Sequence, residues 1–162
     1  MASSQKNLSH YDSQNVPDGS DFSFALVVSD WNKEVTEALF QGALKTLQKH
    51  RVKNSQIKRM NVPGSFELIY GAKKAQEGNP DVVIAIGSVI QGATKHFDFI
   101  CHAVANGVKD LNIQSEVPVI FCVLTDNSLD QAQERSGGKH GNKGVEAAIA
   151  ALQMAALRKA AL

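Results

Sequence analysis

The stretch that decides the fold is residues 82–96, VVIAIGSVIQGATKH. It begins with a strand predicted over Val82–Ser88, which is almost continuously apolar, as strands are when helices cover both faces of their sheet. A loop with two glycines follows, and beyond it apolar residues recur at helical spacing, at Phe97, Ile100, Cys101, Val104, Val108 and Leu111. A strand that runs through a loop into a helix is the repeating unit of a parallel α/β sheet.

The chain contains three further units of this kind. Strands are predicted over Phe24–Val28, Ile57–Val62 and Val119–Leu124, and a helical pattern follows each of them. The closing helix carries its apolar stripe at Val145, Ala148, Ile149, Leu152 and Ala156. The sequence therefore predicts a single α/β domain over residues 22–162, in which helices cover both faces of a four-stranded parallel sheet.

The first helical pattern has an unusually wide apolar arc. To Val35, Leu39 and Ala43 it adds the apolar residues Phe40, Leu44 and Leu47. A surface helix of a monomer rarely needs so broad an apolar face, which favours the hypothesis of a contact between subunits.

Residues 1–21 differ in composition from the rest of the chain. They are rich in Ser, Asn, Gln and Asp and offer almost nothing to bury, so we predict a poorly ordered amino-terminal arm. The arm contains no Arg and includes Asp12, Asp18 and Asp21, which disfavours a transit peptide, and it lacks the apolar stretch of a secretory signal. No apolar run approaches the roughly 18 residues of a membrane span. We expect a soluble, cytoplasmic protein with no membrane partner.

Charge and cysteine content disfavour several classes of function. Lys and Arg number 17 and Asp and Glu number 16, so the net charge is +1 and no overall field favours nucleic acid or an anionic membrane. Cys101 and Cys122 lie inside apolar segments, which is typical of reduced core thiols. His96 and His102 fall on different faces of a helix, so we predict no metal site.

Ligands of open α/β sheets bind beyond the carboxyl ends of the strands, so the loops that follow the strands are the candidate site. These loops are Ser29–Asn32, Pro63–Glu67, Gly87–His96 and Leu124–Asp126. Trp31, the only tryptophan, stands at the tip of the first loop, where its ring can stack on a planar heterocycle. The alternative is an aromatic anchor that packs against the protein itself.

The third loop resembles a phosphate-binding loop without its lysine. Gly87–Thr94 reads GxxxxGAT, where a nucleotide-binding P-loop has GxxxxGK followed by Ser or Thr, so Ala93 disfavours a triphosphate with magnesium. Free backbone N–H groups over Gly92–Lys95, at the start of a helix, can still hold one phosphate or another oxyanion. An ordinary tight turn is the alternative.

Two basic side chains have both a functional and a structural interpretation. His96 falls in the first turn of the helix after the third loop, where the helix dipole favours a neutral imidazole that can accept a proton. It can equally be a polar residue that begins a helix. Arg135 precedes a glycine-rich turn over residues 136–144 and can clamp a phosphate with two parallel hydrogen bonds, or it can be a solvated surface side chain.

Taken together, these segments resemble the lumazine synthase family over Phe22 to about Leu157. The third-loop motif, Gly87-x-Val89-Ile90-x-Gly92-x-Thr94-x-His96-Phe97-Asp98, is highly specific. The other matching segments, in chain order, are Trp31-Asn32, Pro63-Gly64-Ser65-Phe66-Glu67-Leu68, Pro118-Val119, Val123-Leu124-Thr125, Gln131-Ala132, Arg135 and Asn142-Lys143-Gly144-x-Glu146-Ala147-Ala148.

The resemblance implies a flavodoxin-like three-layer α/β/α fold, with active sites between adjacent subunits of a pentamer. The residues implied to contact the pyrimidine substrate and its ribityl chain are Trp31, Asn32, Ser65, Phe66, Glu67, Val89 and Ile90, with Phe121 across the interface and Lys143 nearby. The residues implied to hold a phosphate are Gly92, Ala93, Thr94 and Arg135. His96 is implied to move protons.

The implied reaction condenses 5-amino-6-(D-ribitylamino)uracil with 3,4-dihydroxy-2-butanone 4-phosphate. It yields 6,7-dimethyl-8-ribityllumazine, phosphate and water in riboflavin biosynthesis, with no cofactor and no metal. The implied partners are the two small substrates, further copies of this chain and riboflavin synthase. The short turn over residues 137–142 is similar to that of members that pack twelve pentamers into an icosahedral shell, which favours the shell over a free pentamer.

Two residues depart from the family pattern. Gln91 stands where relatives carry Lys or Arg, which puts one basic contact near the phosphate in doubt, and Ile69 stands where proline is common at a helix start.

Two other functions are alternatives. The first is a flavin-binding or storage paralogue without turnover, against which His96 and Arg135 argue. A phosphoacceptor signalling domain is the second, but it needs clustered acidic residues that Asp30 alone does not supply.

Overall fold

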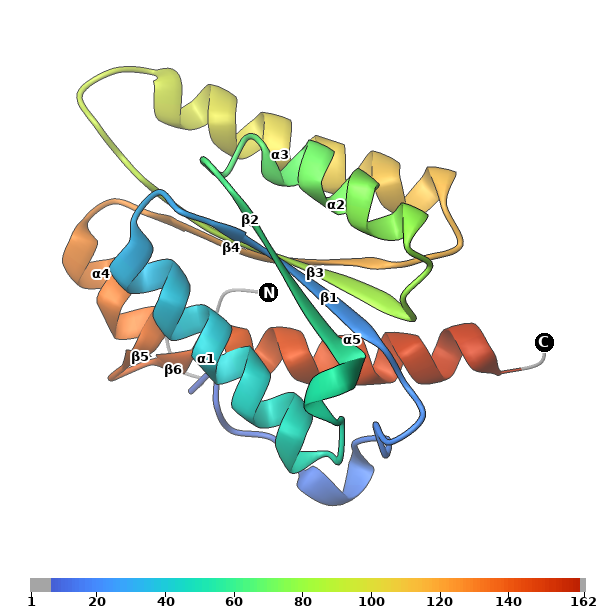
Figure 1. Cartoon of the computed structure of the whole chain (residues 1–162). Coiled ribbons are helices and arrows are strands. Elements are labelled where there is room, and N and C mark those ends of the chain that lie inside the picture. The colour runs from blue at the N-terminus through green and yellow to red at the C-terminus, as the bar shows by residue number, and fades with distance from the viewer. Residues whose placement is uncertain (1–6, 161–162) are drawn as a thin grey trace.

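The computed structural model describes residues 7–160 of the chain. At its centre, four parallel strands form one sheet in the order β2-β1-β3-β4 (Figure 1). The strands are β1 (Phe24–Ser29), β2 (Ile57–Val62), β3 (Val82–Ile90) and β4 (Val119–Asp126). All four predicted strands are confirmed, and β3 and β4 continue further than predicted because Ile90 still pairs with Asp126.

Helices cover both faces of this sheet (Figure 1). One face carries α2 (Leu68–Glu77) and α3 (His96–Gln114), and the other carries α1 (Lys33–Lys49), α4 (Leu129–Arg135) and α5 (Lys143–Lys159). The remaining elements are the 3-10 turns η1 (Ser13–Asn15) and η2 (Asn54–Gln56) and a hairpin between α4 and α5, formed by β5 (Ser136–Gly138) and β6 (Gly141–Asn142). The predicted flavodoxin-like three-layer fold with a four-stranded parallel sheet is confirmed.

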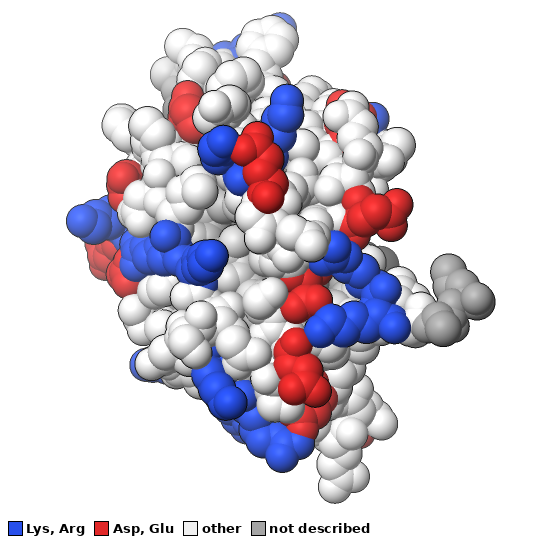
Figure 2. All heavy atoms as spheres, turned by 45° about the vertical axis from the view of Figure 1, so that its right-hand side comes forward, with Lys and Arg blue, Asp and Glu red and all other residues white. Residues whose placement is uncertain are grey.

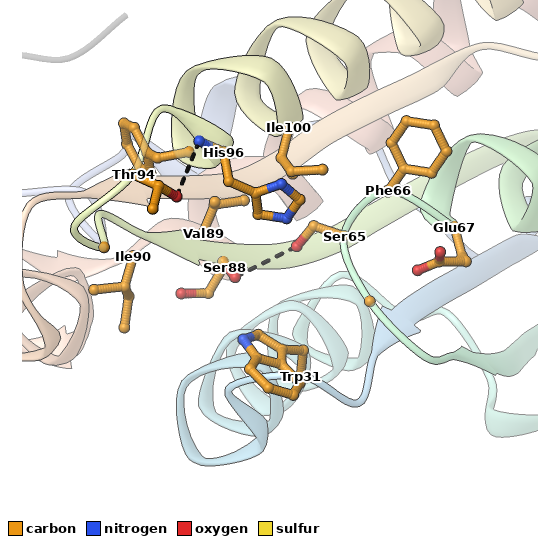
Figure 3. A pocket seen from close by; sticks show the side chains of 13 residues that line it. Trp31, Ser65, Phe66, Glu67, Ser88, Val89, Ile90, Thr94, His96 and Ile100 are labelled. Carbon is orange, nitrogen blue, oxygen red and sulfur yellow. Dashed lines mark hydrogen bonds between the residues drawn. The ribbon is translucent and has the colours of Figure 1, made fainter.

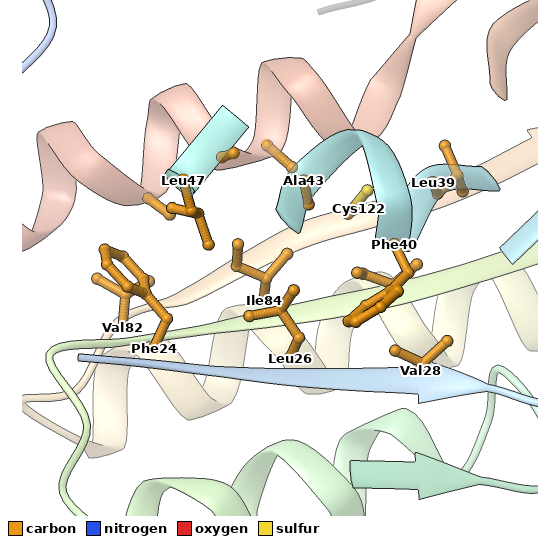
Figure 4. Close-up of a cluster of buried hydrophobic side chains, with 14 of the residues drawn as sticks. Phe24, Leu26, Val28, Leu39, Phe40, Ala43, Leu47, Val82, Ile84 and Cys122 are labelled. Atoms are coloured by element: carbon orange, nitrogen blue, oxygen red, sulfur yellow. The ribbon is translucent and has the colours of Figure 1, made fainter. Parts of the chain in front are cut away.

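Alternate side chains of the strands build two separate cores. Leu26 of β1 and Ile84 of β3 point toward α1 and α5 (Figure 4), whereas their neighbours Val27 and Ala85 point toward α2 and α3. All four side chains are fully buried. Burial of one large apolar side chain contributes roughly 1.5–3 kcal/mol, so both cores together hold the strand ends from which the candidate loops start.

The wide apolar arc of α1 is covered within the chain itself. Leu39, Phe40 and Leu47 are buried, and Leu44 packs against the same core. The sheet covers one part of the arc, and α5, which lies against α1, covers another (Figure 4). The arc is wide because α1 packs on two elements, so the width of the arc does not support the hypothesis of a subunit contact.

The buried face of α5 differs from the predicted stripe. Ala148 and Leu152 are buried as predicted, but Val145, Ile149 and Ala156 are only half-buried. The other buried positions are small residues: Gly144, Ala147, Ala151 and Ala155. Small side chains allow two helix backbones to approach closely, and apolar periodicity does not distinguish such a face from a more hydrophobic one.

The predicted stripe of α3 divides into two parts. Val104, Val108 and Leu111 are buried in the core, as predicted. Cys101 is only partly buried, and Phe97 and Ile100, nearer the start of the helix, line a pocket. Cys122 on β4 is fully buried, and this burial raises the pKa of its thiol to about 12, so the group stays protonated at neutral pH.

The segment before β1 touches the domain through polar groups. Leu8 N–H donates to the His140 carbonyl (2.8 Å), and Ser9 Oγ accepts from the Asn142 N–H (3.0 Å). The Gly19 N–H donates to the His50 carbonyl (2.8 Å). These contacts involve residues 7–21 of the predicted arm, while its first six residues lie outside the described part of the chain.

Ser23 and Asp81 connect the starts of β1 and β3. Asp81 Oδ2 accepts hydrogen bonds from the Ser23 N–H (2.7 Å) and the Ser23 hydroxyl (2.9 Å), and Lys159 Nζ lies 3.4 Å from Oδ1. Burial alone raises the pKa of this carboxyl, but the Ser23 hydrogen bonds and the Lys159 charge outweigh it and bring the pKa below the ordinary value of 3.8.

We expect Asp81→Ala to lower the free energy of unfolding by about 1–3 kcal/mol at pH 7, because it leaves the Ser23 donors unsatisfied. A depressed pKa in the folded state means that the carboxylate contributes stability above its unfolded pKa and loses it as the pH falls. Urea unfolding should therefore show the variant and wild type converging below about pH 3.8. Asp110→Ala, at an exposed ion pair with Lys109, is the control and should change little. A constant difference down to pH 2 would contradict the charge argument.

Candidate active site

Charged side chains of both signs lie beside one another on the face shown in Figure 2. Arg59 pairs with Glu37 at 2.8 Å, and Lys159 lies 3.4 Å from Asp81. Such mixing produces no strong long-range field, so an anionic ligand has to be bound by local groups.

A pocket of about 680 Å³ lies at the carboxyl ends of the strands (Figure 3). This is the position that the parallel sheet predicts for a ligand site. The first, second and third loops and the first turns of α3 contribute its lining, which consists of Trp31, Gly64, Ser65, Phe66, Glu67, Ser88, Val89, Ile90, Gly92, Thr94, His96, Phe97 and Ile100. Nine of the fourteen predicted site residues are therefore together in one pocket: Trp31, Ser65, Phe66, Glu67, Val89, Ile90, Gly92, Thr94 and His96.

Trp31 forms one wall of the pocket with a fixed backbone and a free ring. Its N–H donates to the Pro63 carbonyl (3.1 Å) and to Ser29 Oγ (3.2 Å), which ties the first loop to the second. The side chain is nevertheless 68% exposed. An aromatic anchor would bury its ring against the protein, so this geometry favours the alternative, a ring available for stacking.

The carbonyl of Ser88 joins three segments beneath the pocket. It accepts hydrogen bonds from Asn32 Nδ2 (3.1 Å) and Ser65 Oγ (3.4 Å). Asn32 has a left-handed backbone with φ 55°, a conformation that asparagine tolerates better than most residues. Its side chain therefore holds the first loop against β3 and does not line the pocket of this chain.

The second loop places an aromatic ring and a carboxylate at the start of α2. Phe66 is 50% exposed, and the Glu67 carboxylate lies over Gly64, where an added Cβ would be 2.9 Å from Glu67 Oε2. Ile69, where relatives commonly have proline, donates its N–H to the Phe66 carbonyl (3.4 Å) and packs against Gly107 of α3. Ile69 thus takes part in the start of α2 and in its contact with α3, and it does not line the pocket.

The third loop presents backbone donors to the pocket. The Gln91 N–H donates to the Asp126 carbonyl (2.9 Å), but the N–H groups of residues 92–95 donate to no acceptor in the described part of the chain. They precede the 19-residue helix α3, whose dipole adds a positive potential. Such a turn can bind an oxyanion, and Gln91 takes part in it through its backbone.

His96 lies in the first turn of α3 and faces the pocket from the side opposite Trp31 (Figure 3). Its N–H donates to Thr94 Oγ1 at 3.4 Å, which links the histidine to the third loop. The imidazole is exposed to solvent in the isolated chain. It can exchange a proton with a ligand held between itself and the indole.

Five predicted site residues do not line this pocket: Asn32, Ala93, Phe121, Arg135 and Lys143. Phe121 lies on β4, half-buried against the core under α2 and α3. Lys143 lies at the start of α5, on the opposite face of the sheet, where it pairs with Glu146. Arg135 lies at the end of α4, where its Nε is 3.9 Å from Asp126 Oδ1.

Four pocket residues were given no individual role from the sequence: Gly64 and Ser88, which lie in the candidate loops, and Phe97 and Ile100 at the start of α3. Phe97 and Ile100 have apolar side chains at helical spacing, which also describes a core residue. The one available signal was Ser88, a polar residue inside an otherwise apolar strand.

Two further observations concern ions and membranes. Among residues 7–160, no three His, Cys, Asp or Glu side chains are grouped so that they could hold a metal ion. None of the helices in this range is long and apolar enough to cross a bilayer.

Comparison with known proteins identifies the family. The sequence model of 6,7-dimethyl-8-ribityllumazine synthase matches residues 21–159. A protein of that name from Christiangramia forsetii is 58% identical over 161 residues, which cover 98% of this chain and 96% of the relative. Proteins of the same name from Flavobacterium johnsoniae and Porphyromonas gingivalis are 59% and 49% identical, over 99% and 98% of this chain and 85% and 99% of theirs. The chain therefore belongs to the 6,7-dimethyl-8-ribityllumazine synthase family.

Proposed function

We propose that this protein is a lumazine synthase, a transferase that condenses 5-amino-6-(D-ribitylamino)uracil with 3,4-dihydroxy-2-butanone 4-phosphate in riboflavin biosynthesis. The observation that carries this proposal is the pocket itself, in which an exposed indole faces His96 beside a turn of free backbone donors. A planar heterocycle, a proton carrier and an oxyanion are the three things that the reaction has to bring together. The family and its named relatives support the same activity.

The pyrimidine is proposed to stack on Trp31 and to extend along the second loop. Ser65, Phe66 and Glu67 offer a hydroxyl, an aromatic edge and a carboxylate to the ring and the polyol chain, and Val89 and Ile90 offer backbone groups. The ketone phosphate is proposed to lie with its phosphate on the N–H groups of Gly92, Ala93 and Thr94, which places the carbonyl carbon nearer to His96.

The proposed chemistry proceeds by proton transfers. The 5-amino group of the pyrimidine attacks the ketone, and loss of water gives an imine. Removal of a carbon-bound proton then expels phosphate, and the resulting enol becomes a ketone by taking up a proton at carbon and losing its hydroxyl proton. The ribityl-bearing nitrogen attacks this second carbonyl, and loss of a second water closes the ring. His96 is proposed to carry these protons, a role worth about 10²–10⁴-fold in rate, and alignment of the two substrates supplies much of the rest.

A second copy of the chain is proposed to complete each site. The pocket is open to one side, where Trp31 is 68% exposed and Phe66 is 50% exposed. Phe121, Arg135 and Lys143 lie outside the pocket. The family resemblance supports a pentamer in which these residues reach the pocket of an adjacent subunit. We further propose that twelve pentamers form an icosahedral shell and that riboflavin synthase is a partner. The proposed compartment is the cytoplasm, because both cysteines are free.

The direct test mixes purified protein with both substrates and follows the fluorescence of the lumazine product. We expect formation well above the spontaneous reaction. A folded assembly that binds flavin tightly but gives no acceleration would overturn the proposal in favour of a storage paralogue. Sedimentation velocity on the same sample tests the assembly: a single species of five subunits would overturn the shell, and a monomer would overturn the shared site.

Arg135→Ala tests the phosphate assignment separately. Charged hydrogen bonds contribute about 1.5–3 kcal/mol, so the KM for the butanone phosphate should rise by roughly 10- to 150-fold. The KM for the pyrimidine should change little, because the guanidinium does not serve that ring. Steady-state kinetics with each substrate varied in turn measures both values. Equal increases in the two KM values would contradict the assignment.

A further inference from the structure

Asp126 and Arg135, which lie beside one another, each have a buried polar atom without a hydrogen bond. Among residues 7–160, the buried side-chain atoms without a partner are Ser88 Oγ, Asp126 Oδ2 and Arg135 Nε. Arg135 Nε lies 3.9 Å from Asp126 Oδ1, which is close enough for charge attraction and too far for a hydrogen bond. A buried charge without a hydrogen bond is costly, so this arrangement calls for an explanation.

Asp126 stands at a junction between Arg135 and the third loop. It is the last residue of β4 and pairs with Ile90, the last residue of β3. Its carbonyl accepts from the Gln91 N–H (2.9 Å), directly before the turn of free backbone donors. The residue is only 6% exposed, and burial raises the pKa of its carboxyl while the Arg135 charge opposes that rise.

The burial of Arg135 is uneven along its side chain. The Nε is buried, yet the side chain as a whole is 27% exposed, so the exposure belongs to its other atoms. An Nε edge turned toward a fixed carboxylate leaves the edge formed by Nη1 and Nη2 available. That edge is one of those that a guanidinium uses to bind an oxyanion through two parallel hydrogen bonds.

We propose that Asp126 is a positioning residue, whose buried carboxylate draws the Nε edge of Arg135 inward and presents the Nη edge to the phosphate of the substrate. The proposal rests on the phosphate role of Arg135 given above. The 3.9 Å separation between Arg135 Nε and Asp126 Oδ1 is the open form of the pair, and binding of the phosphate closes it to a hydrogen bond, which satisfies the orphaned Nε. Asp126 thereby acts on the phosphate through Arg135 and touches no reacting atom.

The test is a double-mutant cycle on the assembled protein. Asp126→Ala should raise the KM for the butanone phosphate about tenfold, and should weaken the binding of inorganic phosphate, followed by ³¹P NMR, by a similar factor. The KM for the pyrimidine should stay within about twofold. Asp126→Asn, whose amide oxygen can still accept from Nε, should lie nearer to wild type. In the Arg135→Ala background, Asp126→Ala should have no further effect, because the group that it positions is gone.

Asp130→Ala is the matched control, since it removes the same charge from an exposed site in the first turn of α4. Its phosphate affinity should equal that of wild type. Tighter phosphate binding in Asp126→Ala, or an equal loss in the Arg135→Ala background, would overturn the proposal. If Asp126→Ala does not assemble, Asp126→Asn tests the proposal instead. Wild-type phosphate affinity together with a loss of stability in Asp126→Asn would indicate a purely structural role for Asp126. A failure of the proposed function itself is distinguishable, because Arg135→Ala alone would then leave phosphate affinity unchanged.

Discussion

His96→Ala is expected to lower kcat by about 10²–10⁴-fold while leaving the fold intact. The imidazole faces the pocket from the first turn of α3, opposite the indole of Trp31, and makes no hydrogen bond within the described chain, since the contact to Thr94 Oγ1 is made by the His96 backbone N–H. Because the side chain is exposed and packs against little, its removal should not affect stability. Single-turnover fluorescence of the lumazine product measures the loss, and added imidazole should restore part of the rate.

His102→Ala provides the matched control, since His102 lies on the same helix, is exposed and does not line the pocket. Its kcat should equal that of wild type. Two results would contradict a proton-carrying role for His96: a kcat within threefold of wild type, or an equal loss in the His102 variant. A large loss that added imidazole does not restore would instead point to a role in holding the substrate.

The sheet could be predicted from the sequence because its strands have unambiguous patterns. Val82–Ile86 is continuously apolar, and the structure buries every one of these residues between two helical layers. The arrangement of helices was less accessible. The arc of α1 is wide because the helix packs on both the sheet and α5, and the buried face of α5 consists mainly of small residues. Apolar periodicity therefore gave the wrong reason for the arc of α1 and only part of the buried face of α5.

The candidate site divides in a similar way. Parallel topology places the carboxyl ends of strands at one edge, so Trp31, Ser65 and His96 could be expected to converge from three loops. Asn32 illustrates the limit, since its side chain holds Ser88 and only the folded structure reveals the left-handed turn that aims it there. Arg135 and Lys143 lie on elements that do not line this pocket. The apolar and polar pattern of a single sequence does not reveal which surfaces a second copy of the chain would contact.

Gly144→Ala is expected to destabilise the protein by about 3 kcal/mol or more, the upper range for overpacking a core. Gly144 lies in the first turn of α5, where an added Cβ would be 1.9 Å from the Leu39 carbonyl oxygen of α1. That oxygen belongs to the backbone of a 17-residue helix and cannot swing aside as a side chain would. The change therefore has to push α1 and α5 apart.

Asn142, two residues before Gly144, makes this displacement more costly. Asn142 Nδ2 donates to the carbonyls of Ala38 (2.9 Å) and Ser136 (2.9 Å), and its Oδ1 accepts from the Gly144 N–H (2.8 Å). One asparagine thus joins α1, the hairpin and the start of α5, and moving the two helices apart strains all three hydrogen bonds. The Asn142-Lys143-Gly144 segment, of which the resemblance implies only Lys143 near the substrate, therefore has a structural use in this chain.

Urea unfolding at matched protein concentration measures the effect, since association makes stability depend on concentration. Gly92→Ala is the control, because an added Cβ there would meet no atom within 4 Å, and its stability should remain within about 1 kcal/mol of wild type. A Gly144→Ala protein as stable as Gly92→Ala would show that α1 and α5 can separate at little cost. The contact between these helices would then not be what holds the hairpin and the start of α5 in place.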